Sequence, residues 1–179
     1  AFDSSFQENV AALESAIPLD LSPSQIRASM GAGWIPTEMV EQFTAHLLQG
    51  GEYKIAYIPH LAHWEIDAMY LWRVPDSIAK SRWGTARVHA LELISAGLNA
   101  RTVTVYDQVE EGVRAVNQIE TVAAQAKLSE IKAEFERWLF ADAERAAQLC
   151  VLYNERFNAF RVRDYDGSHL SAPGLNKNI

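Results

Sequence analysis

The C-terminal third of the chain constrains the fold most, because it contains two helical stripes of apolar residues with only a capping residue between them. Asn117 and Glu120 form a capping box at the start of a long helix, and Asp142 can cap the next helix. The inward residues expected are Ile119, Ala123, Ala126, Ile131, Phe135, Trp138 and Leu139 in the first helix, and Ala146, Leu149, Cys150, Tyr153, Phe157 and Phe160 in the second. Consecutive helices of this kind pack as an antiparallel pair.

Two helices are expected before the first glycines of the chain. Residues 5–16 carry apolar residues at helical spacing, and Pro18 ends that helix. Ser22 and Gln25 form a capping box around a proline in the first turn. This pattern predicts a short helix over residues 22–30.

A third helix is expected to begin at Pro36 and to end at Gly50. Together with the helix over residues 22–30, it resembles the outline of a helix-turn-helix motif. Arg27 is the only basic residue of the pair, and two short helices joined by glycines are common in helical domains. The outline therefore does not predict DNA reading.

A small antiparallel sheet of about three strands is expected in the middle of the chain. Its first two strands form a hairpin that turns near Pro59, with Tyr53, Ile55 and Tyr57 in one strand and Trp64 and Ile66 in the other. Residues 102–106 give the third strand. Before it, Thr85 can cap a helix that carries Val88, Leu91, Ile94 and Leu98. The fold class expected is α+β, mostly helical, in a single domain.

The composition limits the classes of function. The net charge of −7 is unsuited to a domain that grips nucleic acid with its whole surface. The single cysteine cannot form an internal disulfide, no signal peptide begins the chain, and no apolar run approaches the roughly 20 residues of a membrane span. We therefore expect a cytoplasmic protein with no membrane partner.

One cluster of potential metal ligands occurs in the predicted hairpin, at His60, His63, Glu65 and Asp67. On a strand, His63, Glu65 and Asp67 share one face. A zinc site needs further ligands at a recognisable spacing, and polar residues of a hairpin turn explain the same pattern. A small metal-dependent enzyme is therefore a remote alternative, and no metal is predicted.

A set of arginines gives the candidate contacts for nucleic acid. Arginines beside aromatic residues bind phosphates and stack on bases, provided that the fold brings them together. The candidates are Arg82, Arg87, Arg156, Arg161 and Arg163, of which the first two flank Trp83. The alternative is that they lie on solvated helix faces or form ion pairs with nearby carboxylates.

Several short motifs, taken in order, resemble one region of a known family. They are Trp34-Ile35-Pro36, Trp83-Gly84-Thr85-Ala86-Arg87, Glu120-Thr121-Val122-Ala123-Ala124, Trp138-Leu139-Phe140-Ala141-Asp142, Tyr153-Asn154, Phe157-Asn158 and Tyr165-Asp166-Gly167-Ser168-His169-Leu170. The region lies just ahead of the helicase motor in very large phage, plasmid and bacterial proteins that join an adenine-specific DNA methylase to a Swi/Snf-type helicase. The resemblance spans nearly the whole chain.

This resemblance implies a domain of a DNA-modifying machine with no active site of its own. In that family the methyl-donor site lies upstream and the ATP-binding motifs lie downstream, so ATP and S-adenosylmethionine are expected in the parent protein only. No catalytic residue is carried over to this chain. The chain begins with Ala1 rather than Met and ends on a polar segment. We therefore expect a domain of a larger protein, with residues 171–179 as a linker.

Three functional hypotheses follow. The first is a non-catalytic accessory domain that packs on the helicase motor and contacts duplex DNA through the five arginines. The second is a pure docking module for another domain or subunit, with Trp72 and Trp83 as exposed aromatic anchors. The third is the metal-dependent enzyme built on the His60 cluster.

Overall fold

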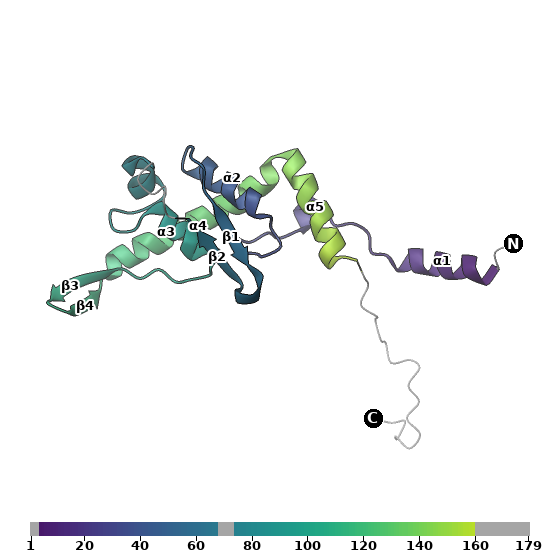
Figure 1. Cartoon of the computed structure of the whole chain (residues 1–179), viewed down its shortest axis with the longest axis horizontal. Coiled ribbons are helices and arrows are strands. Elements are labelled where there is room, and N and C mark those ends of the chain that lie inside the picture. Colours follow the sequence, from purple (N-terminus) through teal and green to yellow (C-terminus); the bar gives the residue numbers. More distant parts are fainter. Residues whose placement is uncertain (1–3, 68–73, 160–179) are drawn as a thin grey trace, which may run out of the picture.

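Helix α4 (Gln118–Ala141) runs along the body, and the other elements of the core pack around it (Figure 1). The computed structural model describes residues 4–67 and 74–159. The fold is α+β and mostly helical, as predicted, with two small antiparallel sheets. None of the helices in these two ranges is long and apolar enough to cross a membrane.

The core is built where α2 (Thr37–Leu47) and α3 (Ala90–Leu98) meet α4. The ring of Phe43 lies edge-on to Phe135, with 4.9 Å between centroids, and both side chains are fully buried. Trp138 completes this aromatic cluster at 5.6 Å from Phe43. Helix α2 matches the predicted helix closely, because its local signals, a proline before the first turn and glycines after the last, agree with its apolar face.

In its first half, helix α4 buries a different face from the one predicted. Its buried residues are Thr121, Ala124, Leu128, Ile131, Phe135 and Leu139. The prediction is confirmed from Ile131 onward, whereas Ile119, Ala123 and Ala126 are exposed. The first half of α4 has apolar residues on two faces, and α3 covers the face of Ala124 and Leu128.

The predicted hairpin is confirmed as β1 (Ile55–Ile58) and β2 (His63–Ile66), joined by the single turn η2 (Pro59–Leu61). The indole of Trp64 is buried. Asn99, just after α3, closes the outer edge of β2: its side-chain oxygen accepts from the Trp64 N–H at 2.8 Å, and its amide donates to the Trp64 carbonyl at 2.9 Å. An asparagine thus takes the place of a neighbouring strand at this edge.

The prediction of a single three-stranded sheet was wrong, because residues 102–105 belong to no strand. They lie along α4 instead, where the Val105 N–H donates to the Thr121 hydroxyl at 2.9 Å and the Gln125 amide donates to the Val103 carbonyl at 3.1 Å. The next residues form a second hairpin, β3 (Tyr106–Glu110) and β4 (Val113–Val116), which projects from one end of the body (Figure 1).

The predicted helix over residues 22–30 was also wrong. Only the turn η1 (Pro23–Gln25) forms: the side-chain oxygen of Gln25 accepts from both the N–H and the hydroxyl of Ser22, but the backbone is already extended at Ile26. Beyond it, Ile26, Ala28 and Met30 are buried while the residues between them are exposed. This alternation is that of an extended segment, so the outline of a helix-turn-helix motif lacks its first helix.

Helix α3 begins four residues later than predicted. His89 rather than Thr85 is its N-cap, and the Thr85 hydroxyl instead accepts from the N–H groups of Arg87 and Val88 in the preceding turn. Gly84 fixes this turn against the π-helix η4 (Ser77–Arg82). A Cβ atom at position 84 would lie 1.9 Å from the Ala79 carbonyl oxygen, so only glycine fits there.

Helix α5 (Ala143–Phe157) begins at Asp142, whose carboxylate accepts from the Arg145 N–H at 2.9 Å, as predicted. The pair of C-terminal helices is present, but the buried residues of α5, Ala146 and Leu149, both lie in its first half. Cys150 is half-buried rather than buried. Phe160 lies outside the described residues.

The second half of α5 packs on the N-terminal segment instead of on α4. The ring of Trp34 lies 5.2 Å from that of Tyr153 and 6.3 Å from that of Phe157. Asn154 accepts from the Leu21 N–H at 2.8 Å and donates to the Leu21 carbonyl at 3.0 Å, and the Asn158 amide donates to the carbonyl of Leu19 at 2.8 Å. These bonds tie the chain just before η1 to the last turns of α5.

Candidate docking surface

The five candidate arginines do not form one basic groove in the described structure. Arg87 is engaged: its guanidinium donates to the Asp107 carboxylate at 2.9 Å and to the Tyr106 carbonyl at 2.8 Å. It therefore fixes the base of the β3–β4 hairpin. Arg161 and Arg163 lie outside the described residues, as does the predicted linker 171–179.

Arg82 and Arg156 lie on different elements, in different surroundings. The guanidinium of Arg82 lies 4.4 Å from the centroid of the Trp83 ring, beside a hollow that Glu130, Glu134 and Arg137 also line. Glu130 and Glu134 are themselves paired with Lys127 and Arg137, so charges of both signs meet around this hollow. Arg156 is exposed in the last turn of α5, and Figure 1 shows η4 and α5 at different ends of the body.

The potential metal ligands of the β1–β2 hairpin are exposed side chains. His60 is exposed in the turn η2, and His63 and Glu65 are exposed on one face of β2, opposite the buried Trp64. Within residues 4–67 and 74–159, no group of three or more His, Cys, Asp or Glu is placed to hold a metal ion.

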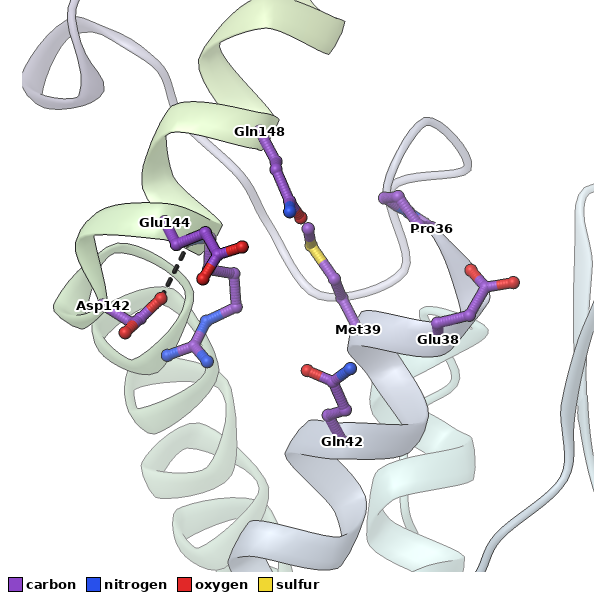
Figure 2. A pocket seen from close by; sticks show the side chains of 8 residues that line it. Pro36, Glu38, Met39, Gln42, Asp142, Glu144 and Gln148 are labelled. Carbon is purple, nitrogen blue, oxygen red and sulfur yellow. Dashed lines mark hydrogen bonds between the residues drawn. The ribbon is translucent and has the colours of Figure 1, made fainter.

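A polar hollow of about 350 Å³ separates the first turns of α2 and α5 (Figure 2). Its side chains include Glu38 and Gln42 from α2 and Glu144 and Gln148 from α5. Arg145, which also lines it, lies 3.6 Å above the Trp138 ring and donates to the Trp138 carbonyl at 2.7 Å. Arg145 thus satisfies the C-terminal carbonyls of α4. Among the residues that line the hollow, no nucleophile contacts a base.

Three described side chains have pKa values that burial moves toward the uncharged form. Burial raises the pKa of the Tyr53 hydroxyl and that of the Cys150 thiol. Burial, followed by the positive charge of Lys80, lowers the pKa of His89, while Asp76 and Glu92 oppose this shift. Desolvation alone explains the first two, and neither group is paired with a base that would activate it.

The β3–β4 hairpin exposes apolar side chains on both of its faces. Tyr106 and Val116 are directly opposite each other, and Val113 lies opposite Glu110 beside the bulge at Val109. All four apolar side chains are exposed. A two-stranded hairpin without a cover is only marginally stable in water, so an additional contact would stabilise it.

Two apolar side chains at the start of α4 are exposed as well. Ile119 is 82% exposed and Val122 is 62% exposed, in the two turns that follow directly after β4. We call the combined set the hairpin surface: Tyr106, Val109, Val113, Val116, Ile119 and Val122. Its borders carry the exposed acidic residues Glu110 and Glu111 and the exposed Arg114.

Polar bonds at its base hold the hairpin surface in place. The Asn117 amide donates to the Asp107 carboxylate at 2.6 Å, and the Asn117 N–H donates to the Val105 carbonyl at 2.8 Å. With the ion pair from Arg87, these bonds fix the direction in which the hairpin leaves the body. The apolar side chains are thus presented on an oriented support.

Sequence reasoning missed the hairpin surface, although a signal for it exists. Glu111-Gly112 separates two runs rich in valine, and Gly112 has a φ of +82°, which a tight hairpin turn requires. Ile119 was recognised as apolar but assigned to the core. Of the proposed aromatic anchors, Trp83 is half-buried, and Trp72 lies outside the described residues.

Comparison with known proteins identifies the family of the chain. The chain has no match among the curated proteins or the solved structures. A family model described as "Domain of unknown function (DUF8437)" matches residues 29–159. The matched part includes the whole hairpin surface and begins after α1 (Ser4–Ala16) and η1. The chain therefore belongs to the DUF8437 family.

Proposed function

We propose that this domain is a non-catalytic docking module, and that the hairpin surface is where it binds its partner. The observation that carries the proposal is the set of large apolar side chains on an oriented hairpin and on the adjoining face of α4. Large exposed apolar side chains gathered in one part of a molecule are typical of protein interaction sites. The match of the family to residues 29–159 includes this surface.

The partner that fits is a protein surface with an apolar groove and basic residues at its rim. Glu110 and Glu111 project at the tip of the hairpin, against the single positive charge of Arg114. A basic rim on the partner would complement these charges and favour correct orientation. The core of the interface would be the valines and Ile119, which lose water on binding.

The resemblance to methylase and helicase proteins suggests where such a partner lies. We propose a cytoplasmic parent protein in which this domain packs on the neighbouring helicase motor, with ATP and S-adenosylmethionine bound elsewhere in that parent. Docking is favoured over direct contact with duplex DNA, because Arg87 is ion-paired and Arg82 and Arg156 lie on separate elements. The reading frame on either side of the chain tests this resemblance, and a frame without methylase and helicase motifs contradicts it.

The docking role is tested by titrating the chain with the separately produced motor domain. Ile119→Glu and Val122→Glu place a charge in the apolar core of the hairpin surface. We expect each to weaken binding at least about tenfold, which corresponds to about 1.4 kcal/mol. Leu61→Glu is the matched control, because Leu61 is similarly exposed but lies in the β1–β2 turn.

Both outcomes of the titration are informative. Unchanged affinity of Ile119→Glu and Val122→Glu, with thermal unfolding like that of the wild type, would show that the hairpin surface is not the docking site. Equal weakening by Leu61→Glu would also exclude it, since the effect would then not be specific to this surface.

A further inference from the structure

Two asparagines of α5, Asn154 and Asn158, hold the chain before η1 through its main chain. The side-chain oxygen of Asn154 accepts from the Leu21 N–H at 2.8 Å, and its amide donates to the Leu21 carbonyl at 3.0 Å. The Asn158 amide donates to the Leu19 carbonyl at 2.8 Å. We call this pair the asparagine clamp. Its members are one helical turn apart and bind residues two positions apart, which face the same side of an extended chain.

The asparagine clamp is oriented by α5 itself. The Asn154 amide also donates to the Cys150 carbonyl at 3.0 Å, and the Asn154 oxygen also accepts from the Asn158 amide at 2.9 Å. These two bonds lie within one helix, so they do not depend on the segment at Leu21. The remaining donor and acceptor of Asn154 match the carbonyl and the N–H of one extended residue. The clamp is therefore preformed for another segment of chain.

The side chains of the bound segment contribute little to its attachment. Leu19 is 88% exposed, Asp20 is exposed and Leu21 is half-buried. Asn99 makes the same pair of bonds to Trp64, but the indole there is 1% exposed and anchors the strand in the core. Leu21 provides no anchor of that kind, so the segment opens at a lower cost in free energy.

We propose that the asparagine clamp is a binding site for an extended peptide segment of a partner protein, and that the chain fills this site with its own residues 19–21. The clamp binds the partner's main chain, so the clamped residue has to be extended and cannot be proline, which lacks the N–H. Strand addition at a sheet edge uses the same main-chain groups. Figure 1 shows α5 at the other end of the body from β3 and β4, so this site is separate from the hairpin surface.

Aromatic rings beside the asparagine clamp indicate which side chains the partner carries. Tyr153 and Phe157 each precede one of the two asparagines, and their rings lie 5.1 Å apart. The ring of Trp34 lies edge-on to both. Phe157 is still 49% exposed with residues 19–21 in place. A partner segment with a large apolar residue next to the clamped one would cover this ring and gain affinity over residues 19–21.

Fluorescence anisotropy with a labelled synthetic peptide of residues 17–27 tests the site in the full chain. The wild type should bind this peptide weakly, because its own segment competes at an effective concentration on the order of millimolar. Leu21→Pro removes the N–H that the segment donates to Asn154, so the affinity for the peptide should rise at least about tenfold. Leu19→Pro is the matched control and should leave the affinity unchanged, because Leu19 is held by its carbonyl, which proline retains.

Variant peptides test the mode of binding with no further change in the protein. On the Leu21→Pro chain, a peptide that itself carries Leu21→Pro should bind at least about tenfold more weakly than the unchanged peptide. A peptide with Leu19→Pro should bind as well as the unchanged one. Thermal unfolding of the Leu21→Pro chain should match that of the wild type, since the buried part of the chain begins only at Ile26.

Two results would overturn the proposal. One is equal affinity of the wild-type and Leu21→Pro chains for the unchanged peptide, or no detectable binding to either, because residues 19–21 would then not occupy an exchangeable site. The other is equal affinity of the unchanged and Leu21→Pro peptides for the Leu21→Pro chain, which would show that the clamp does not bind the main chain of the peptide at that residue.

Discussion

His89 is the N-cap of α3, and its ring nitrogen Nδ1 can accept a hydrogen bond there only while it is unprotonated. Its Nδ1 accepts from the Leu91 N–H at 3.1 Å, which satisfies one of the free donors of the first turn. Burial and the nearby Lys80 lower the pKa of His89 below its ordinary value of 6.5, although Asp76 and Glu92 act in the opposite direction. A single residue therefore couples the stability of a central helix to pH.

We predict that this coupling destabilises the domain as the pH falls. Because the folded state has the lower pKa, the unfolded state binds more protons. The contribution of His89 is therefore complete above the unfolded value near 6.5 and is lost as the pH falls toward the folded pKa. His89→Asn keeps a good N-cap without a titrating group.

Thermal unfolding between about pH 8 and about pH 5.5 measures this effect. The decrease in Tm toward acid pH should be smaller in His89→Asn than in the wild type. His60→Asn is the control, because His60 is exposed in the β1–β2 turn, and it should retain the wild-type decrease. Equal decreases in all three proteins would contradict the role of His89.

At the residue scale, the sequence predicted bonds between residues that are close in the chain, but not bonds between residues that are distant in it. Asn117 and Asp142 were recognised as caps, because each bonds to an N–H three residues away. Asn99 and Asn154 make comparable bonds to backbone groups that are 35 and 133 positions distant. No local pattern indicates those partners. Arg87 was selected by its type, but its bond to Asp107 is likewise visible only in the fold.

At the scale of elements, helices with agreeing local signals were predicted well, and pairing between elements was not. Helices α2, α4 and α5 lie close to their predicted ranges. The first half of α4 has two apolar faces, so periodicity alone cannot tell which one the fold buries. Residues 102–105 have the alternation of a strand, but they bond to α4, since the nearest donors and acceptors are Thr121 and Gln125.

The two hairpins should differ in their resistance to opening. Asn99 closes the outer edge of β2, and Trp64 anchors that strand in the core, whereas β3 and β4 expose side chains on both faces. We predict that hydrogen exchange of backbone amides will be markedly faster in β3–β4 than in β1–β2. Of the two hairpins, only β3–β4 should exchange more slowly when the docking partner is added.

Exchange measured residue by residue tests the difference between the hairpins. The ladder amides of β1–β2 are the internal reference, because both hairpins are antiparallel and similarly short. Equal protection of the two hairpins in the free chain would contradict the view that β3–β4 lacks a cover.

At the scale of the whole molecule, the distribution of charge opposes strong binding of duplex DNA. The net charge is −7; of the described candidate arginines, Arg87 is ion-paired, and Arg82 and Arg156 lie on separate elements. We predict that the isolated chain binds a duplex weakly even at low salt, with a small dependence of affinity on salt concentration. Fluorescence anisotropy with a labelled duplex measures both quantities.

Charge-reversal variants separate specific contacts of an arginine with DNA from the effect of the overall charge of the chain. Arg82→Glu and Arg156→Glu should change the weak affinity for DNA no more than Arg101→Glu, a control at an exposed arginine after α3. A steep salt dependence that Arg82→Glu and Arg156→Glu remove, and Arg101→Glu retains, would instead support a DNA interface.

The bonds of Asn154 and Asn158 to the chain at Leu21 and Leu19 have a mechanical consequence. Tension applied through residue 19 and residue 158 would pass through this short joint and would largely bypass α3 and the aromatic cluster of Phe43. The joint would yield first, because a few hydrogen bonds would carry the load one after another, while the core stayed intact. While the joint holds, the body is attached to the loaded chain at one point and bears no tension; once the joint opens, the load passes through the core.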